Sequence, residues 1–348
     1  MASGINKSEI KEFLRFIGLT GYEIKAYLTL LTLGEATASE LSSKTGIPIS
    51  RVYDVLESLV SRGLAEVKVG RPRVYRAVPP EVGINYYVRK YIDKILEMNK
   101  AVISELSRMY SSVKRKGPFI WISSSMEMSI ERAKEIINEA SMDGFMSLSE
   151  DLFNKLVGTI YRKLMSNESV IFGLVLLFRP TGSKAFEQLL DLGNVDVRIL
   201  PTGIIEALET DFSRAAIFGR TYTLFTSEWE LILLLNEMYY HGYWKIAKRI
   251  KRFEVKEGVK YRTQHHWLSL VLINDGLRSG LNAWVRVRGY RVRSREPIEL
   301  EGFVKETKAN DMIRNFVVET KEYGTLAVGG IGTSVEDIEA RYIEVVFQ

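Results

Sequence analysis

The sequence predicts a multidomain fold of mixed α/β class (α+β overall), because three kinds of pattern follow one another along the chain. Short amphipathic helical patterns and an alternating hairpin pattern fill residues 1–80, followed by one long helical pattern. Strand and helix patterns alternate between residues 117 and 252, as in an α/β layer domain. Residues 253–348 contain mostly short alternating segments, which predict an antiparallel β domain.

Composition limits the classes of protein that the chain can belong to. Its 348 residues suffice for several domains, and its formal net charge of +5 is too small to indicate a nucleic-acid partner by itself. The absence of cysteine excludes disulfides, thiolate metal sites and cysteine nucleophiles. There is no apolar run of signal-peptide or bilayer length, so we expect a soluble, cytoplasmic protein that does not use a membrane.

The segment 47–63 predicts a helix with one polar and one aliphatic face. Pro48 favours a helix start, Ser50 is expected to cap it, and Gly63 is expected to end it. The apolar residues recur at the spacing of one buried face, at Val52, Val55, Leu56 and Leu59. Most such helices only cover a core, so the neighbouring segments have to decide the function.

The segments on either side of this helix predict a winged helix-turn-helix. Residues 8–17 form an amphipathic pattern, Thr20 and Glu23 form a capping box that opens a second helix, and a third short helix ends at Gly46. Residues 64–69 and 74–78 alternate around a Gly-Arg-Pro-Arg tip, which predicts a hairpin.

Residues 62–76 contain five basic side chains and one acid. This predicts a DNA-binding domain in which Ser50, Arg51 and Tyr53 belong to the helix that faces the bases. Phosphate contacts are expected from the basic residues around the hairpin, namely Arg62, Lys68, Arg71 and Arg73. A small winged domain used only for protein contacts is the alternative.

Three motifs in this region resemble those of a known family. They are Gly18-Leu-Thr-x-Tyr-Glu, Ile47-Pro-x-Ser-Arg-Val-Tyr-Asp and Gly70-x-Pro-x-x-Tyr-x-Ala. In order and spacing they are similar to the N-terminal domain of archaeal TrmB-type sugar-responsive transcriptional regulators. The resemblance implies double-stranded DNA and a small sugar effector as partners. It also implies a degenerate phospholipase D-like fold for residues 117–252.

The segment 81–116 predicts a long helix with a narrow apolar stripe, because it contains no proline and no glycine after Gly83. The stripe is heptad-like, with apolar residues at Ile84, Val88, Tyr91, Ile95, Met98, Val102, Leu106, Met109 and Val113. We expect a coiled-coil dimerisation helix roughly 50 Å long. The alternative is a helix that lies along its own downstream domain. Residues 114–118 are expected to mark a domain boundary.

The remaining segments follow the α/β and β plans. Strands are expected at 119–122, 144–148, 170–178 and 195–200, and helices at 126–140, 151–165, 184–191 and 228–252. A hairpin is expected at 215–226 and a helix at 266–274. Strands of the β domain are expected at 283–288, 291–293, 298–304, 316–319, 325–328 and 342–347.

The glycine-rich segment 329–334 lacks the lysine of a phosphate-binding loop, and acidic residues follow it. Freed backbone N–H groups beside Glu336 suit a neutral polyhydroxylated ligand instead. The resemblance implies a sugar site that uses this terminal segment and the segment near residue 315. The residues at matching positions are Arg314, Asn315, Gly330, Ile331, Val335 and Glu336.

Other chemistry-bearing residues give no enzyme or metal site. None of the three histidines, His241, His265 and His266, has the lysine two residues later that phospholipase D catalysis needs, so we predict no catalytic residue. Adjacent histidines cannot share one metal from a strand, and we predict no metal and no cofactor. The arginines between residues 286 and 295 indicate either a solvated hairpin or an anion contact.

Together these patterns predict a homodimeric regulator that binds a palindromic operator and a mono- or disaccharide. Two other classes stay open at this point: an enzyme on the α/β scaffold, and a dimeric sugar-sensing adaptor that does not bind an operator.

Overall fold

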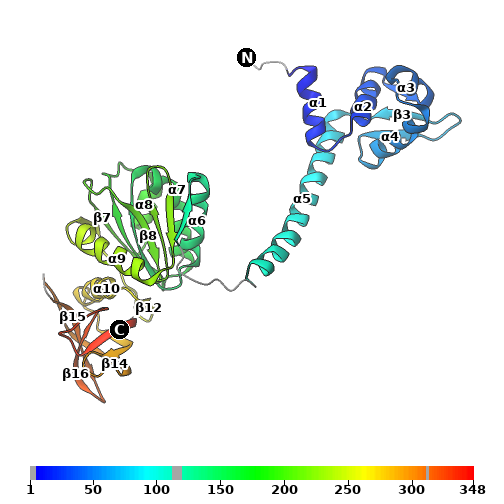
Figure 1. The fold of residues 1–348 in the computed structure, drawn as a ribbon. Coiled ribbons are helices and arrows are strands. Elements are labelled where there is room, and N and C mark those ends of the chain that lie inside the picture. The colour runs from blue at the N-terminus through cyan, green and yellow to red at the C-terminus, as the bar shows by residue number, and fades with distance from the viewer. Residues whose placement is uncertain (1–4, 112–119, 311–312) are drawn as a thin grey trace. The chain divides into compact units, whose positions relative to one another are not determined.

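The structure, a computed structural model, describes residues 5–111, 120–310 and 313–348. The chain divides into two compact units, Met1–Lys116 and Gly117–Gln348, and each is treated by itself. Both contain helices and sheets, so the predicted multidomain α/β class is confirmed (Figure 1). Within the described residues, no helix combines the length and the apolar character needed to cross a membrane.

The first unit begins with short helices around one core. The capping box between Thr20 and Glu23 is confirmed: Glu23 Oε2 accepts from the Thr20 N–H at 2.6 Å, and Thr20 Oγ1 accepts from the Glu23 N–H at 3.3 Å. The prediction that Ser50 caps its helix is wrong, because the helix starts earlier, with Pro48 at the N-cap, so Ser50 lies inside its first turn. The helices are α1 (Lys7–Phe16), α2 (Gly21–Leu33), α3 (Ala38–Thr45) and α4 (Ile49–Ser61).

A small antiparallel sheet completes the winged domain, in the order β1-β3-β2. Its strands are β1 (Glu35–Thr37), β2 (Ala65–Lys68) and β3 (Val74–Ala77). The predicted hairpin of β2 and β3 is confirmed, and Tyr75 of β3 is buried in the core shared with α2 and α4.

Helix α5 (Pro80–Ser111) follows β3 and changes character along its length. Near its start Tyr87 is buried against the winged domain. Farther along, the apolar stripe is open to solvent in the single chain, with Ile95 49% and Val102 52% exposed. The predicted end of the stripe at Val113 and the boundary at residues 114–118 lie outside the described residues.

The second unit is built on an eight-stranded sheet in the order β11-β7-β6-β5-β8-β9-β10-β4. Strands β5, β6 and β7 are parallel, and β5 and β6 are buried along their whole length, as expected for strands covered on both faces. The strands are β4 (Ile120–Ser123), β5 (Asp143–Leu148), β6 (Ile171–Leu176), β7 (Val195–Ile199), β8 (Glu206–Thr210), β9 (Arg214–Phe218), β10 (Thr223–Thr226) and β11 (Lys248–Lys251).

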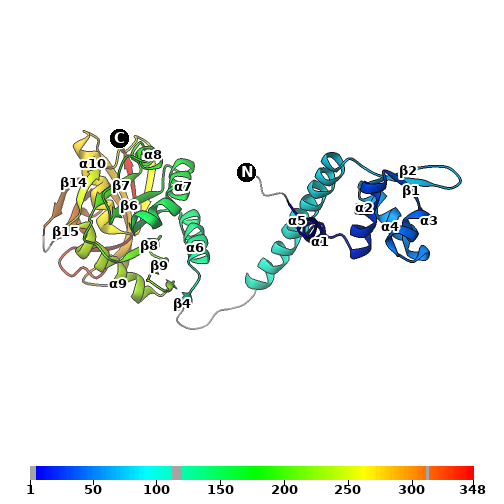
Figure 2. The same cartoon turned by 90° about the horizontal axis from the view of Figure 1, so that it is seen from above.

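Helices cover both faces of this sheet (Figures 1 and 2). Helices α6 (Met126–Glu139), α7 (Glu150–Ser166) and α8 (Lys184–Leu190) share a core with one face. Helices α9 (Trp229–Tyr239) and α10 (His266–Arg278) share a second core with the other face. That second core continues into another sheet, so α10 is packed between the two sheets.

The second sheet has the order β12-β17-β13-β14-β15-β16, and β16 also pairs with β17. Its strands are β12 (Lys260–Thr263), β13 (Ala283–Arg291), β14 (Pro297–Ala309), β15 (Arg314–Thr320), β16 (Gly324–Gly329) and β17 (Ile338–Phe347). The prediction of two separate strands before and after residue 289 is wrong, because β13 runs through this position and bulges against β17 there.

The long helix predicted at 228–252 is also wrong. Helix α9 ends at Tyr239, and a π-helical turn follows over Tyr240–Trp244. Strand β11 then pairs with β7 and forms one edge of the sheet. This pairing is a long-range contact, and the helical periodicity of the segment carried no sign of it. Strands β8 and β12 were missed, and Phe119 of the first predicted strand lies outside the described residues.

Candidate functional site

The polar face of α4 is the first candidate site. Ser50, Arg51 and Tyr53 are exposed on it. The predicted apolar face is buried in the core of the unit, at Val52, Val55, Leu56 and Leu59. The aliphatic face of helix α4 therefore fixes the helix in the domain, and its polar face is exposed, as in a helix that binds in the major groove.

The hairpin beside α4 carries exposed positive charge. Lys68 lies at the end of β2, and Arg71 and Arg73 lie in the connecting turn, all three exposed. Arg76 is different, because it pairs with Glu66 across the hairpin at 2.7 Å. The tip of the hairpin is thus the part of the domain best suited to meet phosphates.

Arg62, which we expected at a phosphate, binds groups of its own chain. It lies at the C-cap of α4, and its Nε is 3.3 Å from a carboxylate oxygen of Glu23. Its Nε also donates to Ser58 Oγ at 3.2 Å, and its Nη1 donates to the hydroxyl of Tyr87. The structure therefore separates Arg62 from the open basic residues of the hairpin.

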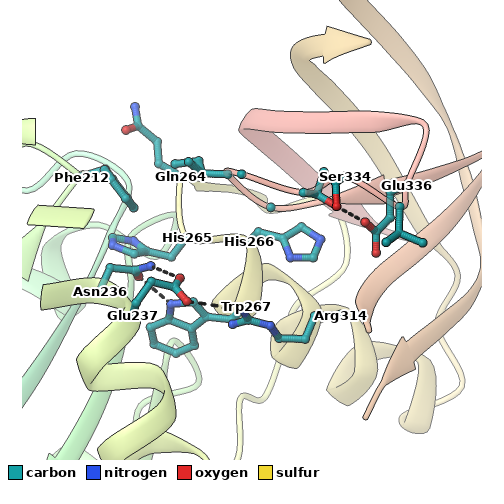
Figure 3. Close-up of a pocket in the computed structure, with 15 residues that line it drawn as sticks. Phe212, Asn236, Glu237, Gln264, His265, His266, Trp267, Arg314, Ser334 and Glu336 are labelled. Atoms are coloured by element: carbon teal, nitrogen blue, oxygen red, sulfur yellow. Dashed lines mark hydrogen bonds and ion pairs between the residues drawn. The ribbon is translucent and has the colours of Figure 1, made fainter. Parts of the chain in front are cut away.

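The second candidate site is a pocket of about 330 Å³ inside the unit Gly117–Gln348 (Figure 3). One side is formed by the turn after β8 and by α9, and the other by the start of α10, the start of β15 and the loop between β16 and β17. The lining residues are Phe212, Asn236, Glu237, Gln264, His265, His266, Trp267, Arg314 and residues 330–336.

Glu336 is only 9% exposed, and neighbouring side chains hold its carboxylate. Asn315 Nδ2 donates to Glu336 Oε1 at 3.2 Å, and Thr333 Oγ1 donates to Oε2. A Cβ at Gly329 would lie 3.0 Å from the Glu336 carboxyl carbon, so the glycine makes room for the acid. Asn315 Oδ1 is buried and has no hydrogen-bond partner among the described residues. Because a carboxylate has about four acceptor positions, Glu336 can still accept hydrogen bonds from a ligand.

Arg314 connects the two sides of the pocket. Its guanidinium is 3.6 Å from Glu237 Oε2 of α9 and lies 4.2 Å from the centre of the Tyr240 ring. Asn236 Nδ2 donates to the other oxygen of Glu237 at 3.1 Å and accepts at its Oδ1 from Trp267 Nε1 at 2.8 Å. The polar side chains of this wall are therefore oriented before any ligand arrives.

His266 is buried and uncharged at neutral pH. Burial lowers its pKa to about 4, against the opposing effect of its hydrogen bond to Val328 O. Since Nε2 lies 3.0 Å from that carbonyl, Nε2 carries the proton and donates it. Nδ1 is then left as an acceptor on the pocket side, near Gly330.

His265 forms a buried charged triad with two acids from the first sheet. Its Nδ1 is 2.8 Å from Asp143 Oδ2 of β5, and its Nε2 is 2.6 Å from Glu209 Oε2 of β8. Burial by itself lowers the pKa of His265, but the charges of Asp143 and Glu209 raise it to about 10. His265 is thus an imidazolium that ties the start of α10, and with it the pocket floor, to the first sheet.

The structure brings five of the six predicted ligand residues to this pocket, namely Arg314, Gly330, Ile331, Val335 and Glu336. The sixth, Asn315, does not line the pocket but donates a hydrogen bond to Glu336, which does. Sequence reasoning missed the lining residues Phe212, Asn236, Glu237 and Gln264. No motif joins these positions, because they come from segments far apart in the chain. No group of three or more metal-binding side chains occurs among the described residues.

The arginines between residues 286 and 295 are largely paired. Arg286 lies 3.1 Å from Glu301, and Arg288 lies 3.1 Å from Glu299 on the neighbouring strand. Arg295 pairs with the buried Glu339 at 2.6 Å. The two cross-strand pairs and the pair of Arg295 with Glu339 favour the solvated hairpin over the anion contact.

Comparison with known protein families identifies three regions of the chain. Residues 14–81 match "Sugar-specific transcriptional regulator TrmB". Residues 119–251 match "Transcriptional regulator TrmB, EBD N-terminal subdomain", and residues 258–347 match "TrmB/TrmBL1, EBD C-terminal subdomain".

Individual proteins with curated functions are also similar. The HTH-type sugar sensing transcriptional regulator TrmBL1 of Pyrococcus furiosus is 27% identical over 96% of this chain and 97% of its own length. The DNA-binding HTH-type transcriptional repressor TrmBL2 of Thermococcus kodakarensis is 26% identical over 66% of this chain and 93% of its own length.

Two solved structures show more distant likeness. The structure of TrmBL2, an archaeal chromatin protein, has a TM-score of 0.46 at 23% identity and covers 70% of this chain and 100% of its own. Nuc from Salmonella typhimurium, a phospholipase D family member, has a TM-score of 0.29 at 13% identity and covers 39% of this chain and 99% of its own. The three family matches lie between residues 14 and 347 and cover most of the chain. They show that the chain belongs to the TrmB family of transcriptional regulators.

Proposed function

We propose that the chain is a sequence-specific, DNA-binding transcriptional regulator whose affinity for its operator changes when a sugar binds in the pocket. The observation that carries the proposal is the presence, in one chain, of an exposed polar helix beside a basic hairpin and of a polar pocket in a second unit. A relative named as a sugar-sensing regulator matches across both units, which supports it.

On the DNA side, Arg51 and Tyr53 face base edges in the major groove, and Ser50 lies beside them on α4. Lys68, Arg71 and Arg73 contact phosphates, because they are exposed and concentrated at one hairpin. Arg62 is left out of this set, since its guanidinium is occupied by Glu23, Ser58 and Tyr87.

Two chains pair through the exposed stripe of α5, and the dimer binds a palindromic operator with one winged domain on each half-site. The support is the run of half-exposed apolar residues on one face of a 32-residue helix, which a single chain leaves in water. We assign residues 1–80 to the winged domain and 81–116 to this pairing helix.

The ligand is a neutral mono- or disaccharide. The pocket side chains offer acceptors at Glu336 and His266 and a donor at Arg314, and Gly330 supplies a backbone N–H. Asn315 supports the site from behind by donating to Glu336. The His265 imidazolium is already paired with two acids of the first sheet. Among the other lining residues, the acids Glu237 and Glu336 outnumber the cation Arg314, which disfavours a phosphorylated ligand.

Residues 117–252 and 253–348 form the two halves of a binding scaffold without catalysis, and the first is a degenerate phospholipase D-like domain. The His-x-Lys pattern of that enzyme is absent from the whole sequence.

A gel-shift assay with the full chain and the DNA upstream of its own gene tests the DNA half of the proposal. Calorimetry with a panel of mono- and disaccharides, with and without operator, tests the sugar half. Because binding free energies are linked, a sugar that changes operator affinity must have its own affinity changed by the operator to the same factor. Sugar binding without any operator binding would indicate an adaptor instead. Operator binding that no sugar alters would overturn the sugar half.

A further inference from the structure

Arg62 lies at a point where three segments of the first unit meet. These are the turn between α1 and α2, the C-terminal end of α4, and the first turns of α5. Its Nη1 donates to the Tyr87 hydroxyl, and it also donates to Gly18 O at 3.4 Å. The Tyr87 hydroxyl in turn donates to Ile17 O at 3.1 Å. One guanidinium and one phenol therefore connect α5 to both other segments.

The other side of Arg62 faces a buried acid. Glu23 is 4% exposed, and its Oε1 accepts from Ser58 Oγ of α4 at 2.5 Å. Burial alone would raise the pKa of Glu23, but hydrogen bonds from Ser58 and Thr20 and the charge of Arg62 lower it below the ordinary value. Glu23 is therefore a carboxylate, and it holds the end of α4 and the Arg62 side chain against α2.

A cap or a stabilising ion pair would explain part of this arrangement, but it needs no contact with α5. The continuation to Tyr87 is the informative part, because Tyr87 is buried while its neighbour Tyr86 is exposed. The Arg62 guanidinium also lies 5.3 Å from the centre of the Tyr87 ring. The base-reading helix is thus bonded, through one side chain, to the helix that carries the exposed apolar stripe.

The angle between these helices has a large effect at a distance. From Tyr87 to Val102, α5 extends about 22 Å, so a tilt of about 10° at Tyr87 displaces Val102 by roughly 4 Å. That is close to the ~3.4 Å rise of one base pair. An error of this size would shift the two winged domains of a dimer relative to their half-sites.

We propose that Glu23, Arg62 and Tyr87 form a positioning junction, which fixes the angle of α4 against α5 and so sets the half-site spacing that the dimer accepts. This inference rests on the proposed function, because it requires a dimer on DNA. None of the three residues needs to touch DNA for this role.

The test uses the full chain and a series of operators whose two half-sites are separated by the natural spacing or by one or two base pairs more or fewer. We expect the wild-type protein to bind one spacing at least tenfold better than its neighbours. Tyr87→Phe keeps the buried ring and removes the hydroxyl, so it should flatten this profile to within about threefold. Arg62→Lys should do the same, because an ammonium lacks the guanidinium's forked donors.

Tyr86→Phe is the matched control, since it removes a hydroxyl from the exposed neighbour on the same helix, and it should keep the wild-type profile. Equal loss of affinity at every spacing in Tyr87→Phe would mean that the residue only stabilises the domain, and would overturn the inference. So would an unchanged profile in both variants, or a wild-type protein that binds DNA without spacing preference. A wild-type protein that binds no DNA would overturn the proposed function together with it.

Discussion

The two units differ in how they present their polar side chains. On the first unit, Arg51, Arg71 and Arg73 extend into solvent from α4 and the hairpin. In the pocket of the second unit, the acids Glu237 and Glu336 are already hydrogen-bonded by neighbouring side chains. The cations of the first unit are therefore exposed to solvent, whereas the acids of the pocket are held in place by hydrogen bonds before a ligand binds.

This difference indicates different energetics for the two kinds of binding. When exposed cations of the protein contact DNA phosphates, the release of counterions from the DNA supplies much of the binding free energy. The affinity for DNA should therefore fall strongly as the salt concentration rises. A pocket with oriented donors and acceptors loses little entropy when it binds a neutral ligand, and its affinity should depend little on salt. The predictions below test this contrast, from the largest expected effect to the smallest.

The largest effect is expected from the open apolar stripe of the first unit. Ile95→Asp with Val102→Asp would place charges in the proposed dimer interface, where they have no partners. Light scattering should show monomers, and operator binding should collapse because two half-sites are no longer bridged. The control Ser104→Asp with Ser107→Asp puts the same charge on the opposite face of α5 and should stay dimeric. A double variant of the stripe that remains a dimer would place dimerisation elsewhere.

The next effect concerns the buried triad beneath the pocket. Glu209→Gln leaves the His265 imidazolium without one of its two acids, and we expect a loss of about 3–5 kcal/mol of unfolding free energy. All five tryptophans lie between residues 121 and 284, so their fluorescence reports the second unit alone. Urea unfolding followed in this way measures the loss. A loss below about 1 kcal/mol would mean that the triad does not hold the pocket floor.

The same triad gives the second unit a pH dependence with a defined sign. The pKa of His265 is raised from 6.5 to about 10 in the folded chain. Its contribution to stability is therefore complete below pH 6.5 and is lost as the pH rises through about 10. Between these limits the slope for one proton is at most about 1.4 kcal/mol per pH unit. Glu209→Gln should flatten this slope.

A smaller effect is expected at the pocket. Glu336→Ala removes a charge-assisted hydrogen-bond acceptor, which is worth about 1.5–3 kcal/mol, so sugar affinity should fall tenfold to a hundredfold. Glu336→Gln keeps the shape and one acceptor oxygen, and it should lie between wild type and Glu336→Ala in calorimetry. Operator binding without sugar should be unchanged in both. If Glu336→Ala binds sugar normally, the ligand lies elsewhere.

Local sequence patterns predicted the structure correctly where it depends on residues that are close in sequence. Thr20 and Glu23 are three residues apart, so their capping box could be read directly, and the buried face of α4 followed from its spacing. The segment 240–251 could not be read in this way. There the chain leaves the helix because Arg249 pairs with Asp275 of α10 and β11 pairs with β7, and both contacts are remote in sequence.

The candidate pocket shows the same division. Gly330 and Glu336 lie in one short segment, and a family resemblance was enough to mark them. Phe212, Glu237 and the triad of His265 come from segments that only the packing of two sheets around α10 brings together. Arg62 shows the opposite error. As a basic residue beside the hairpin it was predicted to contact a phosphate, but its guanidinium pairs with the buried acid Glu23, 39 positions earlier in the chain.

The smallest effect should come from single charges on the hairpin, and it tests the contrast most directly. Arg71→Ala removes an open cation, so operator affinity should fall similarly for all sequences, and the dependence of log K on log salt should flatten by about one unit per half-site contact. Arg76→Ala removes the same charge from the same hairpin, but there the guanidinium is already paired with Glu66. Its effect on the salt slope should therefore be clearly smaller.

Equal slopes for the two variants would show that pairing within the protein does not decide whether a cation contacts DNA. The proposed difference between exposed cations in the first unit and hydrogen-bonded acids in the pocket would then not explain DNA binding. A slope unchanged by Arg71→Ala would remove the hairpin from the DNA interface altogether.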